Sequence, residues 1–454
     1  MRIGLFLQDL ANVNWEKRYN EVIKLCKKAE LDLLVFPENT YCPKMDELEE
    51  CYYFDDNDEG YGIIKDFVCD LSKNAGCAVL FCHFSKEDYI YSFYANEFSE
   101  DGETYNNDYC KHTATWNSPL DGRIEIDDPF FGYDFNIINL KNFKIGQTIC
   151  YDSTFPLFSR MYGLNNVDIL INSTGGHVDY KKWSYYQKVR AIENDCFNLC
   201  IMANMDNSRK NESYVFAYNK YGRKLPLAIV DSNGSIKKVT DNSIKDALYV
   251  FDIEKNEFNW FWENKYEDDE FLNQKATKNK NVHTYISVKR ITEMISSSNK
   301  LAPNLYCVPK WNYNLILCLV HGKDILIPEK VAELEYNDDL KRIDNKRYLI
   351  VNMWDEPVKS DFYNGVLSNI LKVRTVENYS ALFFYDGAKE LCLQTGKNKN
   401  VQVVAKDFDG SYSLDFDRMT GPEAIWRTSV QTQMRSEWRD GYEDILKYIL
   451  KNKK

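Results

Sequence analysis

Short apolar runs alternate with amphipathic stretches along residues 1–253. The runs have the length of β-strands, and they cover residues 2–8, 31–36, 78–84, 90–98, 143–149, 167–173, 197–204, 213–219 and 247–253. Between several of them, apolar residues recur every three or four positions, which predicts helices over residues 15–29, 63–71 and 181–195 and from Pro156 onward. Because helices alternate with strands and some strands form hairpin-like pairs, the pattern predicts a mixed sheet with helices on its outer faces.

The pattern changes after Ile253. Aromatic and charged residues fill the next segment, which ends in the polar stretch N-Q-K-A-T-K-N-K-N, so we expect an arm and a linker over residues 259–281. New strand-like runs follow, with a last amphipathic helix over residues 441–450. The sequence thus predicts an α/β domain over residues 1–258 and a smaller α+β domain of unknown role over residues 282–454.

Composition narrows the class of protein. A chain of 454 residues with 44% hydrophobic residues is long enough for two packed domains. The net charge of −12 disfavours a nucleic-acid partner, because phosphate binding needs a concentrated basic surface. No apolar run reaches the roughly 18 residues of a membrane helix, and an acidic residue comes too early for a signal peptide. The 13 cysteines are odd in number and scattered, which favours a reducing cytoplasm.

Cys150 stands where an apolar run ends and the chain turns toward a helix, in I-C-Y-D-S-T-F-P. A strand end is a common position for a nucleophile, because the strand fixes the backbone while the turn exposes the side chain. The alternative is a buried structural cysteine, which packs as a small hydrophobic residue.

Glu38 and Lys111 also follow strand-like segments, in L-L-V-F-P-E and D-Y-C-K. Attack of a thiol on an amide needs a base for the thiol proton, a donor for the oxyanion and an acid for the leaving amine. Each residue alone is typical of an exposed charge. Together with Cys150 they can supply all three functions.

These stretches resemble the nitrilase (carbon–nitrogen hydrolase) superfamily over residues 1–260. The resemblance rests on F-P-E, the lysine of Y-C-K, I-G-Q-T-I-C-Y-D-S-T-F-P, V-D-I-L-I-N-S and R-A-I-E-N at 190–194. The order and spacing of these motifs make the match specific. The family implies a four-layer αββα sandwich and a Glu–Lys–Cys triad.

The resemblance assigns a role to each triad residue. Glu38 would be the general base, Cys150 the nucleophile and Lys111 the donor to the oxyanion, a task that the backbone amide of Tyr151 would share. Lys111 would also favour the thiolate of Cys150. Many members carry a further glutamate after the lysine, for which Glu125 is the best candidate here. Arg190 and Glu193, on one helix, are expected to satisfy buried polar groups instead.

No cofactor or metal is expected from the sequence. The five histidines lack metal-ligand spacing, and no phosphate-binding G-x-x-x-x-G-K-[ST] motif occurs. The expected ligand is a small amide or carbamoyl compound. We also expect a homo-oligomer, because the helix after the cysteine is rich in apolar residues (Leu157, Phe158, Met161 and Tyr162). Aromatic residues set among polar ones in the C-terminal domain favour a protein partner there, or a core of its own.

Three functions remain open from the sequence. The first is hydrolysis of a non-peptide carbon–nitrogen bond. The second is N-acyl transfer, in which an amine replaces water at the thioester. The third is a nitrilase-like sensor or assembly module coupled to the C-terminal domain.

Overall fold

The computed structural model of the chain describes residues 1–9, 14–38, 40, 42, 59–83, 91–96, 108–111, 135–175, 180–203, 213–255, 276, 284–310, 313–328, 330–331, 340, 343, 345–378, 380–396 and 401–416. It separates into two units, Met1–Trp262 and Glu263–Lys454. The segment that joins them lies outside the described residues, as does the helix expected at 441–450. The boundaries expected at 258 and 281 therefore stay predictions.

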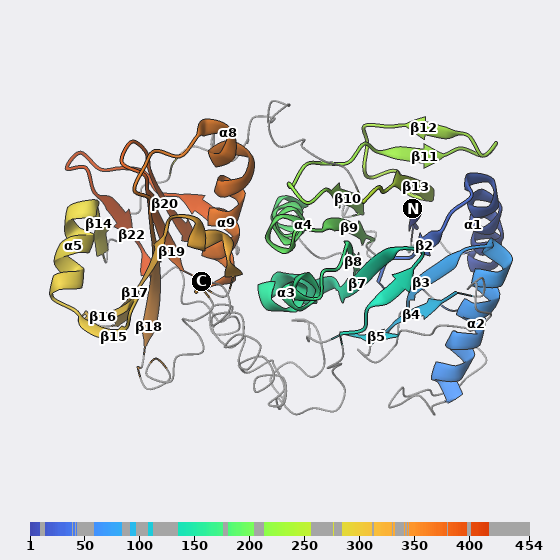
Figure 1. Ribbon diagram of the computed structural model, residues 1–454, viewed down its shortest axis with the longest axis horizontal. Helices are drawn as coiled ribbons and strands as arrows, with labels where there is room; N and C mark the ends of the chain where they lie inside the picture. The colour runs from blue at the N-terminus through green and yellow to red at the C-terminus, as the bar shows by residue number, and fades with distance from the viewer. Residues whose placement is uncertain are drawn as a thin grey trace. The chain divides into compact units, whose positions relative to one another are not determined.

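The first unit contains two sheets and four helices among its described residues (Figure 1). The elements of the first sheet and its helices are β1 (Arg2–Leu7), α1 (Trp15–Ala29), β2 (Leu33–Val35), α2 (Glu59–Ala75), β3 (Ala78–Cys82), β4 (Tyr91–Ala95), β5 (Tyr109–Cys110), β11 (Ala228–Val230), β12 (Ile236–Lys238) and β13 (Ala247–Asp252). Those of the second are β6 (Ile138–Leu140), β7 (Phe143–Ile149), the 3-10 turn η2 (Cys150–Thr154), α3 (Pro156–Leu164), β8 (Ile169–Thr174), α4 (Tyr180–Asn194), β9 (Phe197–Met202) and β10 (Tyr214–Tyr218).

Parallel strands form the centre of both sheets. In the described residues the first sheet has the order β12-β11-β13-β1-β2-β3-β4-β5, and the second has the order β10-β9-β8-β7-β6. Strands β1, β2 and β3 run parallel, as do β7, β8 and β9. The expected hairpin of β3 and β4 is confirmed by their antiparallel pairing. Parallel strands bring their carboxyl ends to one edge, and β2 and β7 each lead there into a candidate residue.

The two sheets pack face to face. Along β1, Ile3, Leu5 and Leu7 belong to a buried cluster shared with the second sheet, while Phe6 packs with α1 and α2 on the opposite side. This alternation follows from the two-residue period of a strand. On the outer face of the second sheet, α3 and α4 complete the stack, and Figure 1 shows the resulting layers. The predicted αββα sandwich is confirmed.

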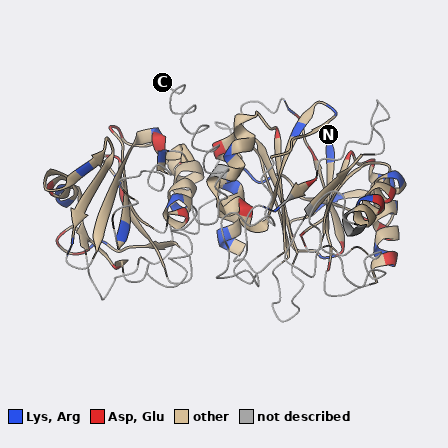
Figure 2. Cartoon of the chain, turned by 90° about the horizontal axis from the view of Figure 1, so that it is seen from below, with Lys and Arg blue, Asp and Glu red and all other residues tan. Residues whose placement is uncertain are grey.

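Local signals explain where the first helix begins and ends. The Asn14 side chain accepts a hydrogen bond from the Lys17 amide at 3.1 Å, which caps α1. Glu30 closes the helix in the left-handed region, with φ of 52°. Figure 2 shows the charged residues gathered on helices and at strand ends, whereas the sheets are largely uncharged.

Helix α3 buries part of the apolar surface that suggested oligomerisation. Phe158 and Tyr162 are both buried, with their rings close to the Phe135 ring in the same unit. A side chain on Gly146 would come within 2.5 Å of the Tyr162 ring, so glycine is needed where β7 meets α3. These two aromatic residues therefore stabilise the unit itself, and the oligomer stays a prediction.

The described residues of the second unit form a mixed sheet in the order β15-β16-β17-β18-β19-β20-β21 and a two-stranded sheet of β14 and β22. Strands β17, β18 and β19 are parallel. Its elements are β14 (Thr284–Ile286), α5 (Val288–Ser296), β15 (Asn299–Ala302), β16 (Leu305–Pro309), β17 (Asn314–His321), η4 (Gly322–Leu326), β18 (Lys346–Met353), α8 (Ser360–Phe362), η5 (Tyr363–Leu367), α9 (Ser368–Glu377), β19 (Ala381–Tyr385), β20 (Glu390–Thr395), β21 (Val401–Val403) and β22 (Tyr412–Leu414). The described helices include none long and apolar enough to cross a membrane.

Candidate active site

Cys150 lies at the point where β7 ends and the 3-10 turn η2 begins. Its backbone has φ of 44°, in the left-handed region that a residue with a side chain rarely adopts. Such a conformation persists only where the surrounding structure fixes it, and it is common at functional positions. The Cys150 side chain is buried, with the residue 8% exposed.

Glu38 and Lys111 meet beside this turn. Glu38 follows β2, Lys111 follows β5, and the Lys111 ammonium donates a hydrogen bond of 2.6 Å to Glu38 Oε1. The second carboxylate oxygen, Oε2, accepts a hydrogen bond from the Gly175 amide at 2.6 Å, directly after β8. Glu38 and Lys111 are 3% and 5% exposed, so their charges face each other away from water. The structure thus brings the two predicted residues together.

The Cys150 thiol belongs to the same cluster. Burial raises the pKa of this thiol most, the Glu38 carboxylate raises it further, and Lys111 offsets only part of the effect. The thiol is hydrogen-bonded to Glu38. The raised pKa favours the neutral thiol of Cys150. Lys111 lowers the pKa of the thiol, as expected, but burial and Glu38 raise it by more.

Lys111 keeps its positive charge in this setting. Burial by itself lowers the pKa of its ammonium, but Glu38, Cys150 and Asp152 raise it above the usual value. A buried ammonium that is held in place by its hydrogen bond to Glu38 can stabilise negative charge that forms nearby.

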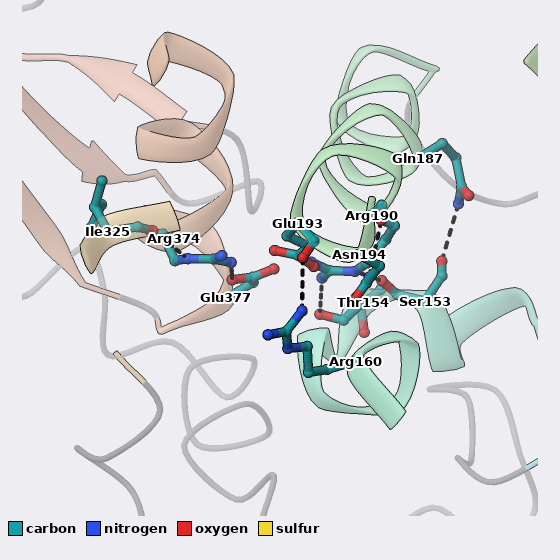
Figure 3. A network of polar contacts seen from close by, with 10 residues as sticks. All are labelled: Ser153, Thr154, Arg160, Gln187, Arg190, Glu193, Asn194, Ile325, Arg374 and Glu377. Atoms are coloured by element: carbon teal, nitrogen blue, oxygen red, sulfur yellow. Dashed lines mark hydrogen bonds and ion pairs between the residues drawn. The ribbon is translucent and has the colours of Figure 1, made fainter. Parts of the chain in front are cut away.

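Helix α4 holds the cysteine turn in place (Figure 3). Arg190 is fully buried and donates from Nε to the Ser153 carbonyl at 2.8 Å and from Nη2 to the Thr154 carbonyl at 3.1 Å. Its third contact is an ion pair with Glu193, one turn along the helix. Since the guanidinium is planar, these three contacts fix its orientation. The expected scaffold role of Arg190 and Glu193 agrees with these bonds.

A buried asparagine supports the turn from β8. Asn172 donates from Nδ2 to Thr148 Oγ1 at 3.0 Å, and its Oδ1 accepts from Gln187 Nε2 at 3.2 Å. Gln187 also donates to Ser153 Oγ at 3.1 Å, and Ser153 Oγ donates to the Cys150 carbonyl at 3.1 Å. Hydrogen bonds from β8 and α4 thus converge on the residue with the strained backbone.

The part of the chain that carries this site matches a known protein family. The sequence profile of the carbon–nitrogen hydrolase family matches residues 13–236. These residues contain the whole Glu38, Lys111 and Cys150 cluster. They form a carbon–nitrogen hydrolase domain of the nitrilase superfamily. The C-terminal part of the chain has no assignment.

Two curated proteins resemble parts of this carbon–nitrogen hydrolase domain. A probable nitrilase of Schizosaccharomyces pombe is 30% identical over 125 residues, which cover 27% of this chain and 42% of that protein. An apolipoprotein N-acyltransferase of Borreliella burgdorferi is 31% identical over 102 residues, which cover 21% of this chain and 18% of that protein. The chain therefore spans less than half the length of either relative.

Solved amidase structures also resemble the chain. A crystal structure of an amidase from Nesterenkonia sp. has 15% sequence identity and a TM-score of 0.40, covering 56% of this chain and 90% of the amidase. A cysteine-to-alanine variant of the amidase from Nesterenkonia sp. AN1, in complex with butyramide, has 13% identity and a TM-score of 0.40, with the same two coverages.

The auxiliary residues expected from the sequence are only partly visible. Tyr151 follows Cys150 in η2, with its ring edge-on to Phe155 at 5.2 Å between centroids. Glu125 lies outside the described residues. Among the described residues, no group of three or more His, Cys, Asp or Glu side chains is arranged to hold a metal ion.

Three contributors to the carbon–nitrogen hydrolase site were not predicted. Gly175 donates to Glu38, while Tyr109 and Asp152 hydrogen-bond each other beside the triad. Tyr109 precedes Lys111 by two residues and Asp152 follows Cys150 by two, so both lie within the motifs named above. Their contact joins different sheets, and nothing in the local sequence signals it.

Proposed function

We propose that this chain hydrolyses a small amide or carbamoyl compound, with Cys150 as nucleophile, Glu38 as proton carrier and Lys111 as donor to the oxyanion. One observation carries the proposal. The Glu38 carboxylate is held by Lys111 at 2.6 Å and by the Gly175 amide at 2.6 Å while it faces the Cys150 thiol. A single carboxylate in contact with both thiol and ammonium can serve every proton transfer of the reaction.

Acylation begins with proton transfer. The thiol proton moves to Glu38 as the Cys150 sulfur bonds to the carbonyl carbon, and the electron pair of the C=O bond moves to oxygen. Lys111 and the backbone amide of Tyr151 are proposed to bind this oxyanion. When the intermediate collapses, the carbon–nitrogen bond breaks and Glu38 gives its proton to the leaving amine. A thioester on Cys150 remains.

Water completes the cycle. Glu38 takes a proton from the attacking water, a second oxyanion forms beside Lys111, and the carbon–sulfur bond breaks. The acid product leaves, and the Cys150 sulfur regains its proton from Glu38. Because burial and Glu38 raise the pKa of this thiol, we expect its proton to pass to Glu38 as the sulfur attacks.

The proposal is tested by ammonia release from a panel of small primary amides, carbamoyl compounds and nitriles. Wild-type protein should release ammonia from at least one amide or carbamoyl compound. Cys150→Ser should lose roughly 10⁴-fold or more of this activity, because members of a catalytic set act as a unit. Cys392→Ala provides a control, since it removes a buried thiol of the second unit. Equal activity in wild type and Cys150→Ser would overturn the proposal.

A second candidate function is N-acyl transfer, since the curated relative from Borreliella burgdorferi is named an apolipoprotein N-acyltransferase. Both reactions share the thioester on Cys150 and differ in what attacks it. Adding a primary amine to the ammonia assay separates them. Hydrolysis predicts the free acid as the main product, whereas acyl transfer predicts an N-substituted amide.

A further inference from the structure

In the described part of the chain, the strand that leads to Lys111 pairs with one neighbour. β5 contains two residues there and ends the order of the first sheet. It pairs with β4 at Tyr91 with Cys110 and at Ser92 with Tyr109. A two-residue edge strand constrains the following residue weakly. The position of Lys111 relative to Cys150, on the other sheet, therefore needs a further constraint.

Tyr109 and Asp152 supply a direct connection between the two sheets. The Tyr109 hydroxyl donates to Asp152 Oδ2 at 2.8 Å, and the same oxygen accepts from the Ile149 amide at 3.2 Å. Both side chains are buried, with Tyr109 1% and Asp152 0% exposed. Residues two apart in an extended segment point to one face, so Tyr109 and Lys111 share a side of β5. Asp152 lies within the cysteine turn.

The charge of Asp152 also acts on Lys111. Glu38 and Asp152 both raise the pKa of the Lys111 ammonium against the effect of burial. In the proposed reaction Glu38 becomes neutral each time it holds a proton. The Tyr109 hydroxyl and the Ile149 amide, which both donate to Asp152, do not change charge in that cycle.

We propose that Tyr109 and Asp152 form a positioning pair that fixes Lys111 against the Cys150 turn. The inference rests on the roles proposed above for Lys111 and Cys150. Neither residue of the pair needs to touch the substrate. Both residues act through the hydrogen bond between them.

Two substitutions separate position from charge. Tyr109→Phe removes the hydroxyl and keeps the ring, and Asp152→Asn removes the charge but retains an oxygen that can accept the hydroxyl. Tyr249→Phe is the matched control. The Tyr249 hydroxyl accepts from the Ile244 amide at 2.8 Å and donates to the Asp241 carbonyl at 3.0 Å. It lies on β13, with β1, β2, β3 and β4 between it and β5.

The first measurement is the rate of Cys150 alkylation by iodoacetamide at a fixed pH of about 8, followed by peptide mass spectrometry. At a pH below the pKa of a thiol, lowering that pKa by about one raises the thiolate fraction about tenfold. Asp152→Asn should speed alkylation about threefold or more, because a negative charge near the thiol is removed. Tyr109→Phe should slow it by a similar factor, because Asp152 loses a donor and Lys111 is less well placed. Tyr249→Phe should leave the rate unchanged.

The second measurement is kcat/KM for an amide substrate, with unfolding midpoints for every variant. Tyr109→Phe should lower kcat by about tenfold or more with little change in KM, as expected when a hydrogen bond to a charged group is lost from a positioning contact. Tyr249→Phe should be destabilised to a similar extent with kcat intact.

The possible outcomes distinguish failure of the positioning pair from failure of the proposed function. Alkylation rates that change in the same direction in Asp152→Asn and Tyr109→Phe, or that match Tyr249→Phe, would overturn the positioning pair. If Asp152→Asn does not fold, the test of the positioning pair rests on whether Tyr109→Phe slows or speeds the alkylation of Cys150. If wild-type protein turns over no amide, the proposed function fails, yet the alkylation series still tests the pair, since it requires no substrate.

Discussion

Cys150 combines a left-handed backbone with a buried thiol whose pKa is raised. Ser153, Asn172 and α4 hold the turn in which it lies. In the proposed reaction Glu38, which is hydrogen-bonded to the thiol, controls its reactivity. A nucleophile of this kind gains its activity from an adjacent base and not from a lowered pKa.

The raised pKa of the Cys150 thiol predicts a specific labelling order. A raised pKa favours the neutral thiol at pH 7, and the thiolate fraction then rises with pH. Iodoacetamide at pH 7 should therefore label the half-buried Cys69 before Cys150. The rate at Cys150 should keep rising about tenfold per pH unit up to at least pH 9. A rate at Cys150 that reaches a plateau below pH 8 would contradict the resting state described here.

Removing Lys111 should damage both activity and stability. Lys111→Ala takes away the proposed oxyanion donor, for which a loss of about 10²–10³-fold in kcat is typical. It also leaves Glu38 buried without its cation, at a cost of about 3–5 kcal/mol in the free energy of unfolding. Lys141→Ala is the control, because Lys141 pairs with Asp32 at the surface and is 60% exposed. There the cost should be about 1 kcal/mol or less. Urea unfolding and ammonia release measure the two effects.

At the scale of elements, the strand ends could be predicted and the contacts between sheets could not. Apolar runs placed β2, β7 and β8 correctly, because a buried parallel strand is apolar on both faces. Glu38 and Cys150 then follow from the positions where these runs stop. The Tyr109–Asp152 contact depends on how one sheet lies on the other, and the positions of single residues carry no such information.

Some elements were missed for identifiable reasons. Helix α9 has every residue from Ser368 to Glu377 buried, including Lys372 and Arg374, so no polar face marks its period in the sequence. Strands β11 and β12 are three residues each, and β12 is exposed throughout. Short exposed strands lack the apolar alternation by which a strand is recognised.

The contact between α4 and the cysteine turn predicts that substitution of Arg190 lowers activity. Arg190→Lys keeps a cation for Glu193 but loses the fork that binds the Ser153 and Thr154 carbonyls. Activity should fall roughly 10- to 100-fold, since small displacements of a nucleophile are costly.

The second unit offers a matched control for Arg190. There Arg374 pairs with Glu377 at 2.8 Å with the same spacing along a helix, and it donates to the Ile325 carbonyl at 3.2 Å (Figure 3). Arg374→Lys should destabilise its unit by a similar amount and leave kcat unchanged. Equal kcat values for the two variants would show that the Arg190 contacts do not position Cys150.

At the scale of the whole chain, the proposed chemistry lies within Met1–Trp262. The residues that contact Glu38, Lys111 and Cys150 in the described part of the chain all precede the linker. For the second unit we keep the proposal that it regulates or recruits a partner. A chain that stops after residue 281 should therefore remain folded by circular dichroism and retain the alkylation rate of Cys150. A folded truncated chain with an inert Cys150 would show that the second unit completes the site.

Oligomerisation stays a prediction, and fewer apolar residues of α3 now support it. Phe158 and Tyr162 are buried inside the unit, whereas Met161 of the original apolar set is partly exposed. We still expect a homo-oligomer at micromolar concentration, as the family resemblance implies. Light scattering coupled to gel filtration measures the mass, and a mass of about 53.4 kDa, that of one chain, would contradict the expectation.

The central claim is that Cys150 forms a thioester with the acyl group of an amide. Its most direct test is acid quenching during turnover, followed by peptide mass spectrometry. The account predicts an added acyl mass on the peptide that contains Cys150, which hydroxylamine removes and which Cys150→Ala lacks. Turnover of the amide with Cys150 unmodified at every quench time, and undiminished activity in Cys150→Ala, would contradict it.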